Sequence, residues 1–107
     1  MTYRVKTELP AQQEIRASLA WGREKWGVAQ AQKWVQGLRK AIATLSTFPE
    51  RYPIVPELEQ EELGHEVRQM IFQRYRVLFT IKKNTVHVLH VRGAFKGNVS
   101  TEQEEAE

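Results

Sequence analysis

The sequence contains no cysteine. This absence excludes a disulfide-stabilised scaffold and a metal site built on thiolates. No apolar run approaches the roughly 20 residues that a membrane-spanning helix requires. The first residues, Met1 to Lys6, also lack the apolar stretch of a secretory signal peptide. We therefore expect a cytoplasmic protein that does not contact a membrane, and we expect no metal and no cofactor.

The chain has 107 residues, of which 41% are hydrophobic and 27% are charged. These values are ordinary for one globular domain. Because so short a chain can build little more than one core, helices and sheet should share a single apolar layer. We expect one domain over residues 1–98. Residues 99–107 should form an acidic, disordered tail, because from Thr101 onward no apolar residue is larger than alanine.

The net charge of +3 is unremarkable, but its distribution is uneven. Residues 65–98 contain seven basic residues and a single acid, Glu66. Such asymmetry suggests an anionic partner for this part of the chain. An equally good interpretation is a solvated strand face on which Lys and Arg prevent aggregation.

Two segments in the first half have the apolar periodicity of amphipathic helices. The first helix should begin at Pro10 and end at Gly27, the usual residue types at these two positions. The second should end before Pro49. The short connection between them predicts an antiparallel helix hairpin. Its apolar stripes are Ile15, Leu19, Gly22 and Trp26, then Ala31, Trp34, Val35, Leu38, Ile42 and Leu45.

Strands are expected on both sides of the hairpin, first at residues 3–8 and then, after a loop at 50–64, at 65–72, 75–83 and 85–92. The last three are joined by tight turns, and in Lys83-Asn84 the asparagine tolerates the positive φ that such turns require. Period-two alternation predicts a shared face for Val86, Val88, His90 and Arg92. The expected fold class is α+β, in the order β-α-α-β-β-β, with an antiparallel sheet packed against the two-helix hairpin.

Three segments carry a family resemblance. The first is the hairpin, with Trp26-Gly27 at its turn and Ala41-Ile42-Ala43-Thr44-Leu45 and Phe48-Pro49 at its end. The second is Val67-Arg68 leading into Arg74-Tyr75-Arg76-Val77-Leu78-Phe79, and the third is Val86-His87-Val88-Leu89-His90-Val91-Arg92-Gly93. In order and spacing they resemble the RelE/ParE toxin superfamily over roughly residues 3–97.

The resemblance implies the toxin half of a bacterial type II toxin–antitoxin, or plasmid-stabilisation, module that inhibits growth. The implied partner is a cognate antitoxin, which blocks the toxin in a hetero-oligomer. RelE-like members cleave mRNA at the ribosome, whereas ParE-like members poison DNA gyrase. Both targets stay open, and so does a non-toxic binding module with the same fold.

A nuclease of this kind needs a group that takes the proton of the attacking ribose 2′-hydroxyl, and cations that neutralise the phosphate. His90 is the candidate acid–base group by residue type. Arg68 and Arg92 resemble the family's strand arginines, and their guanidinium groups match phosphate geometry. The alternatives are ion pairs between these arginines and the loop acids Glu59 to Glu62, and a half-buried His90 satisfied by a neighbour.

Nuclease members often carry a tyrosine or histidine beyond the last strand. This chain has Phe95 there, which can stack on a base but cannot transfer a proton. The departure favours the ParE-like branch, and whether the chain is an enzyme stays open. In either branch the predicted binding residues are Arg68, Arg74, Arg76, Arg92, Phe95 and Lys96.

The tryptophans receive different predictions. Trp26 and Trp34 fall on the apolar stripes and are assigned to the core. Trp21 falls off the stripe, so it lies either at the edge of the core or at an exposed interface, where aromatic side chains are enriched.

Overall fold

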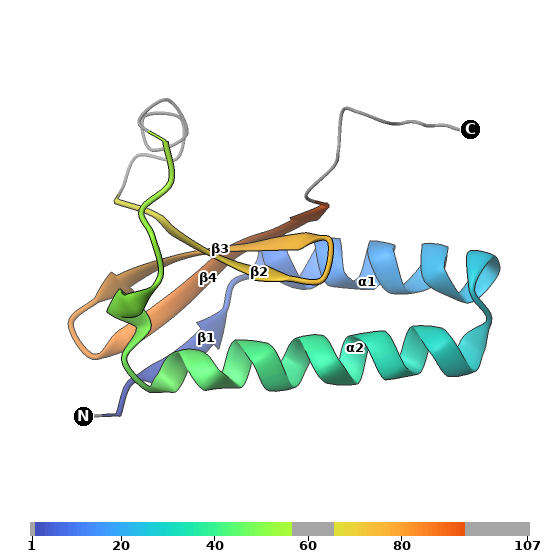
Figure 1. Cartoon of the computed structure of the whole chain (residues 1–107), viewed down its shortest axis with the longest axis horizontal. Helices are drawn as coiled ribbons and strands as arrows, with labels where there is room; N and C mark the ends of the chain where they lie inside the picture. Colours follow the sequence, from blue (N-terminus) through green and yellow to red (C-terminus); the bar gives the residue numbers. More distant parts are fainter. Residues whose placement is uncertain (1, 57–65, 94–107) are drawn as a thin grey trace.

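The computed structural model describes residues 2–56 and 66–93. The predicted α+β class and the element order are confirmed, and the two helices lie together against one face of the sheet (Figure 1). Phe95 and Lys96 lie outside the described residues, as does the predicted acidic tail. The elements are β1 (Arg4–Thr7), α1 (Leu9–Lys25), α2 (Val28–Ala43), the 3-10 turns η1 (Thr44–Ser46) and η2 (Pro49–Arg51), β2 (Arg68–Phe72), β3 (Tyr75–Lys82) and β4 (Thr85–Gly93).

The predicted helix hairpin is confirmed, with a turn that only glycine makes easily. Gly27 has a φ of 93°, a conformation that disfavours any residue with a Cβ atom. The second helix ends earlier than expected. It stops at Ala43 and is followed by η1. Thr47 and Phe48 then separate η1 from Pro49, and Phe48 has a left-handed φ of 48°.

The sheet is mixed, with strand order β1-β4-β3-β2. The antiparallel prediction holds for β2, β3 and β4, because each pair is joined by a short turn. β1 instead lies parallel to β4, with Val5 beside Val86. In the tight turns, positive φ falls on Gln73 (54°) and Lys83 (57°) rather than on Asn84.

A register shift in the β3–β4 pair changes the predicted faces of β4. Phe79 pairs with Val88, but the preceding Leu78 pairs with His90, which leaves Leu89 as an extra residue. Val88 and Val91, three residues apart, therefore both face the helices. The prediction that His90 and Arg92 share a face with Val86 and Val88 is wrong, because the bulge moves this pair to the opposite face.

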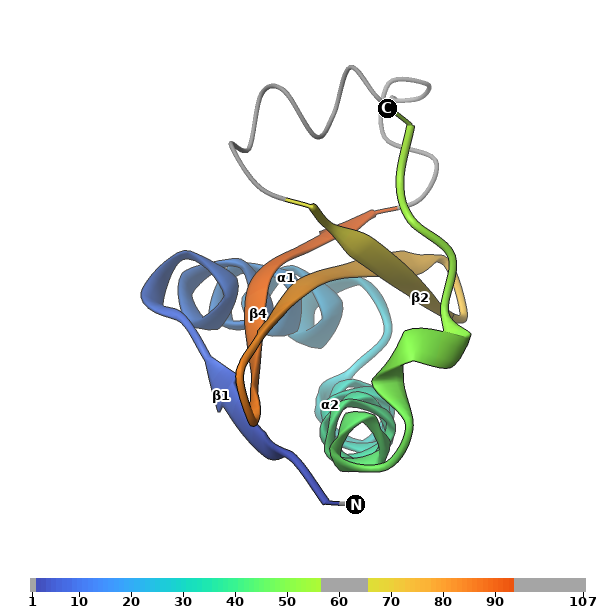
Figure 2. The same ribbon diagram turned by 90° about the vertical axis from the view of Figure 1, so that its left-hand side faces the viewer.

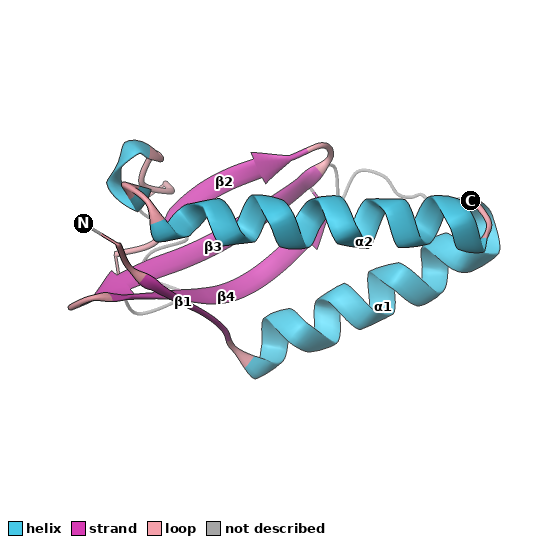
Figure 3. Cartoon of the chain, turned by 90° about the horizontal axis from the view of Figure 1, so that it is seen from below, coloured by secondary structure: helices cyan, strands magenta, loops and turns pink. Residues whose placement is uncertain are grey.

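The apolar side chains form a core on each face of the sheet. The helix-side core contains α1, α2 and the fully buried Phe79, and the tilted helices cover this face in Figure 3. On the other face, Leu78 is fully buried under Val55 and Val67. Figure 2 shows the chain from η2 rising past β2 to reach this outer face.

The tryptophan predictions had mixed outcomes. Trp34 is buried in the helix-side core as predicted. Trp26 is 41% exposed, so its assignment to the core was wrong, and Trp21 is 50% exposed. Within the described ranges, no helix is both long and apolar enough to cross a membrane.

Candidate functional site: a basic sheet face and a helix–strand hollow

Basic side chains gather on the sheet face that points away from the helices. Strand register places them there, since cross-strand partners point to the same side of a sheet. We call this surface the basic sheet face. Its cations are Arg4, Lys6, Arg76, Lys82 and Arg92.

Arg76 and Arg92 lie directly opposite each other on β3 and β4. Like charges in this position destabilise a sheet unless other groups offset the repulsion. The Nε of Arg76 donates a hydrogen bond to Oε1 of Gln69 on β2, at 2.8 Å. Two guanidinium groups side by side form a surface suited to phosphate or carboxylate groups.

His90 lies on the same face as Arg92, in contact with a carboxylate. Its Nδ1 is 3.2 Å from both carboxylate oxygens of Glu14 on α1, and its side chain is 21% exposed. Glu14 also accepts a 2.8 Å hydrogen bond from the backbone N–H of Val91. A carboxylate that orients a histidine ring is part of acid–base sites, and it is equally a way to satisfy a half-buried histidine.

Arg68 lies apart from the other two nuclease candidates. It pairs with Phe79, so it lies on the helix side of the sheet, whereas His90 and Arg92 lie on the outer side. Its Nη1 donates hydrogen bonds to the backbone carbonyls of Glu50 (3.0 Å) and Tyr52 (2.7 Å). The three candidates do not converge on one point, and Arg68 connects η2 to the sheet.

A second histidine–carboxylate pair joins the start of α1 to β4. Nδ1 of His87 is 2.7 Å from Oε2 of Glu8. This hydrogen bond, with smaller effects from Lys6 and Lys82, holds the pKa of Glu8 below its usual value. Glu8 and Glu14 therefore place two carboxylates along the edge of the basic sheet face.

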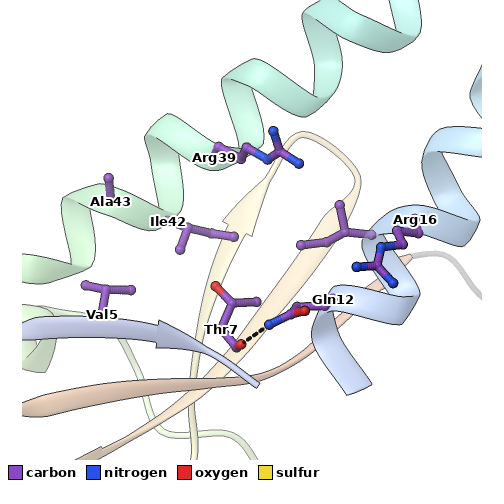
Figure 4. Close-up of a pocket in the computed structure, with 8 residues that line it drawn as sticks. Val5, Thr7, Gln12, Arg16, Arg39, Ile42 and Ala43 are labelled. Atoms are coloured by element: carbon purple, nitrogen blue, oxygen red, sulfur yellow. Dashed lines mark hydrogen bonds between the residues drawn. The ribbon is translucent and has the colours of Figure 1, made fainter. Parts of the chain in front are cut away.

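The helix side of the molecule carries a hollow of about 450 Å³ between β1, α1 and α2 (Figure 4). Its apolar wall includes Val5, Ile15 and Ile42, and two arginines, Arg16 and Arg39, line it from the two helices. Across residues 2–56 and 66–93, neither guanidinium forms a hydrogen bond or an ion pair. We call this feature the helix–strand hollow. The lining residues are Val5, Thr7, Gln12, Ile15, Arg16, Arg39, Ile42 and Ala43.

Sequence reasoning missed Glu14, Arg16 and Arg39. Each of them looks like an ordinary solvated residue of an amphipathic helix, and only the packing of α1 and α2 against the sheet gives them a role. Among the described residues, no group of three or more potential metal ligands is arranged around one point.

Comparison with known proteins identifies the family. The model of the family described as "ParE toxin of type II toxin-antitoxin system, parDE" matches residues 5–94. No curated protein matches the chain. Among solved structures, the fold is similar to a chain of the "Chromosomal ParDE TA system from P. aeruginosa", with a TM-score of 0.73 and 16% sequence identity over 86% of this chain and 96% of that one.

The two-helix hairpin on a mixed four-stranded sheet is thus a fold that this chain shares with a solved chain of a ParDE system, and the family match places the chain among the toxins of type II toxin–antitoxin systems. The chain belongs to the ParE toxin family, because the family match extends over most of its length. This confirms the resemblance to the RelE/ParE superfamily and the preference for its ParE-like branch.

Proposed function

We propose that this protein is a cytoplasmic growth inhibitor that binds DNA gyrase and is held inactive by a cognate antitoxin. Membership of the ParE toxin family is the observation that carries the proposal. The separation of Arg68 from His90 and Arg92 supports binding rather than RNA cleavage, because a phosphoryl-transfer site needs its cations and its proton acceptor within reach of one phosphate.

The basic sheet face is the surface that we assign to the target. A topoisomerase at work on DNA offers carboxylates and phosphates, and the adjacent guanidinium groups of Arg76 and Arg92 suit both. Positive charge on this face would also speed the encounter with an anionic complex.

A supercoiling assay with purified gyrase tests the target. Excess protein should inhibit supercoiling or trap a cleavage complex. Arg76→Glu combined with Arg92→Glu should weaken the effect about tenfold or more. Arg23→Glu combined with Lys40→Glu, an equal charge change on the helix hairpin, should leave it near the wild-type level. Unchanged supercoiling at excess wild-type protein would refute the choice of gyrase.

Expression without the neighbouring gene tests toxicity itself. Growth arrest is expected. Normal colony growth would favour the remaining alternative, a non-toxic binding module with the toxin fold.

The helix–strand hollow is the surface that we assign to the antitoxin. Its arginines have no carboxylate among the described lining residues, and its remaining wall is largely apolar. A Glu or Asp side chain on an otherwise apolar antitoxin segment would pair with Arg16 and Arg39 and bury methyl groups against Ile15 and Ile42. Charge complementarity would add to the association rate as well as to the affinity.

Binding to the protein encoded by the adjacent open reading frame tests this assignment. Arg16→Glu combined with Arg39→Glu should weaken binding by about a hundredfold, since two charged contacts become repulsive. The Arg23→Glu and Lys40→Glu double variant is the control for net charge and should bind as the wild type does. Equal weakening in both double variants would show that only overall charge matters.

Ribosome-dependent mRNA cleavage is the second candidate, and the contact between His90 and Glu14 favours it, because a carboxylate on Nδ1 leaves Nε2 for proton transfer. Primer extension on mRNA from induced cells should then show cuts in phase with the codons, lost in His90→Ala. Intact mRNA in growth-arrested cells would exclude this candidate.

A further inference from the structure

The three tryptophans of the chain gather at the turn between α1 and α2. Trp21 and Trp26 meet edge to face with ring centroids 5.3 Å apart, and Trp26 and Trp34 do so at 6.3 Å. Trp34 then packs on Tyr75 of β3, at 4.9 Å. The row leads from the helix-side core out to solvent, where Trp21 and Trp26 are about half exposed.

A second hollow, of about 320 Å³, lies beside this row. We call it the tryptophan hollow. It combines two indole walls, two side-chain amides and one ammonium group, and none of its described lining residues is acidic. These residues are Trp26, Gln30, Lys33, Trp34 and Gln73.

Gly22 leaves room for the Trp26 ring and lowers the helix propensity of α1. A Cβ atom on Gly22 would lie 2.9 Å from Cε3 and Cζ3 of the Trp26 ring, so only glycine lets the indole lie there undisturbed. Glycine inside a helix is unfavourable, and this one makes room for a side chain that is still 41% exposed. That arrangement makes little sense for core packing and fits a surface shaped for a ligand.

One polar feature points to the same use. Trp34 is 5% exposed, and its Nε1 is buried with no hydrogen-bond acceptor among the described residues. A buried donor without an acceptor is costly, and an acceptor supplied by a ligand in the hollow would remove that cost.

We propose that the tryptophan hollow binds an unstacked nucleobase of a single-stranded nucleic acid. The exposed face of Trp26 would stack on the base, and the amides of Gln30 and Gln73, which both donate and accept, would contact its edge. The ammonium group of Lys33 would pair with an adjacent phosphate. Aromatic, amide and cationic groups in one hollow match a base with its phosphate better than they match an apolar peptide.

Titration of the whole protein with short oligothymidylate tests the proposal. Because every tryptophan lies in this row, intrinsic fluorescence reports directly on the hollow. Oligothymidylate should quench it at saturation, whereas an abasic deoxyribose-phosphate strand of the same length should bind weakly and quench little.

Variants then separate stacking from charge, with binding followed by the anisotropy of a labelled strand. Trp26→Ala should weaken binding about tenfold or more, and Trp26→Phe should retain most of the affinity. Lys33→Ala should weaken binding, whereas Lys40→Ala, a matched control on the same helix outside the hollow, should not. Thermal unfolding of each variant confirms that it is folded.

Three results would overturn the proposal. One is equal binding of the abasic strand, which would reduce the interaction to charge. Another is wild-type affinity in Trp26→Ala. The third is a tryptophan signal that responds to the antitoxin but to no oligonucleotide, which would make the hollow a protein interface. None of these results bears on growth arrest, so the proposal fails or stands independently of the toxin assignment.

Discussion

Gly22→Ala should destabilise this protein, although a glycine-to-alanine change in the interior of an ordinary helix is stabilising. The usual gain in helix propensity is about 1 kcal/mol. Here the new Cβ would lie 2.9 Å from the Trp26 ring, so the indole must move. Movement disrupts its edge-to-face contacts with Trp21 and Trp34, each worth about 0.5–1.5 kcal/mol. With about 1–3 kcal/mol lost against 1 gained, the expected net destabilisation is about 1 kcal/mol.

A double-mutant cycle with Trp26→Ala measures this effect. In that background the ring is absent, so Gly22→Ala should stabilise the protein by about 1 kcal/mol. The coupling between the two positions should therefore be about 2 kcal/mol. Urea unfolding gives the free energies, and thermal unfolding should show Gly22→Ala lowering the Tm by about 4–8 °C. Stabilisation by Gly22→Ala in the wild-type background, or zero coupling, would refute the reasoning.

Three further predictions concern the sheet. Arg68→Ala should destabilise the protein by about 1.5–3 kcal/mol in urea unfolding, because it loses two charged hydrogen bonds to backbone carbonyls. Arg92→Ala should change stability by less than about 0.5 kcal/mol. Equal effects would contradict a structural role for Arg68 and a binding role for Arg92. Leu78→Ala should lower the free energy of unfolding by about 2–5 kcal/mol, since the side chain is fully buried. A loss below about 1 kcal/mol would show that Leu78, Val55 and Val67 do not form a second core. In NMR titrations, His87→Ala should raise the pKa of Glu8 toward its usual value, and an unchanged Glu8 titration in the variant would exclude the contact. In the wild type, the stability that comes from this lowered pKa is complete above the unfolded-state pKa of glutamate. It is lost as the pH falls through the folded-state pKa of Glu8.

The helix hairpin and the three-stranded meander could be predicted because their signals are local. The 3.6-residue period of the apolar residues, Gly27 at the hairpin turn and the period-two alternation of β3 all lie within windows of a few turns. The same local signals failed where packing outside the window decided the outcome. Trp26 has stripe periodicity, yet it lies past the end of α1, where the sheet no longer covers it.

The candidate site was predictable only in its chemistry. The concentration of Arg and Lys in the last three strands is visible in the sequence, and much of it does form one face. The faces of individual residues were not predictable, because a single extra residue in β4 reverses the alternation at His90 and Arg92. The helix–strand hollow was also invisible, because it brings together residues from three elements between Val5 and Ala43.

By itself, then, the sequence determined the fold class, the family resemblance and the sign of the charge on the sheet, since each of these depends on composition and short-range periodicity. Only the tertiary structure decided that β1 lies parallel to β4, that Arg68 lies away from His90 and Arg92, and that Glu14 reaches His90. These are contacts between residues far apart in the chain. Their geometry is set by how the helices tilt and how one strand bulges, which no local pattern of residues encodes.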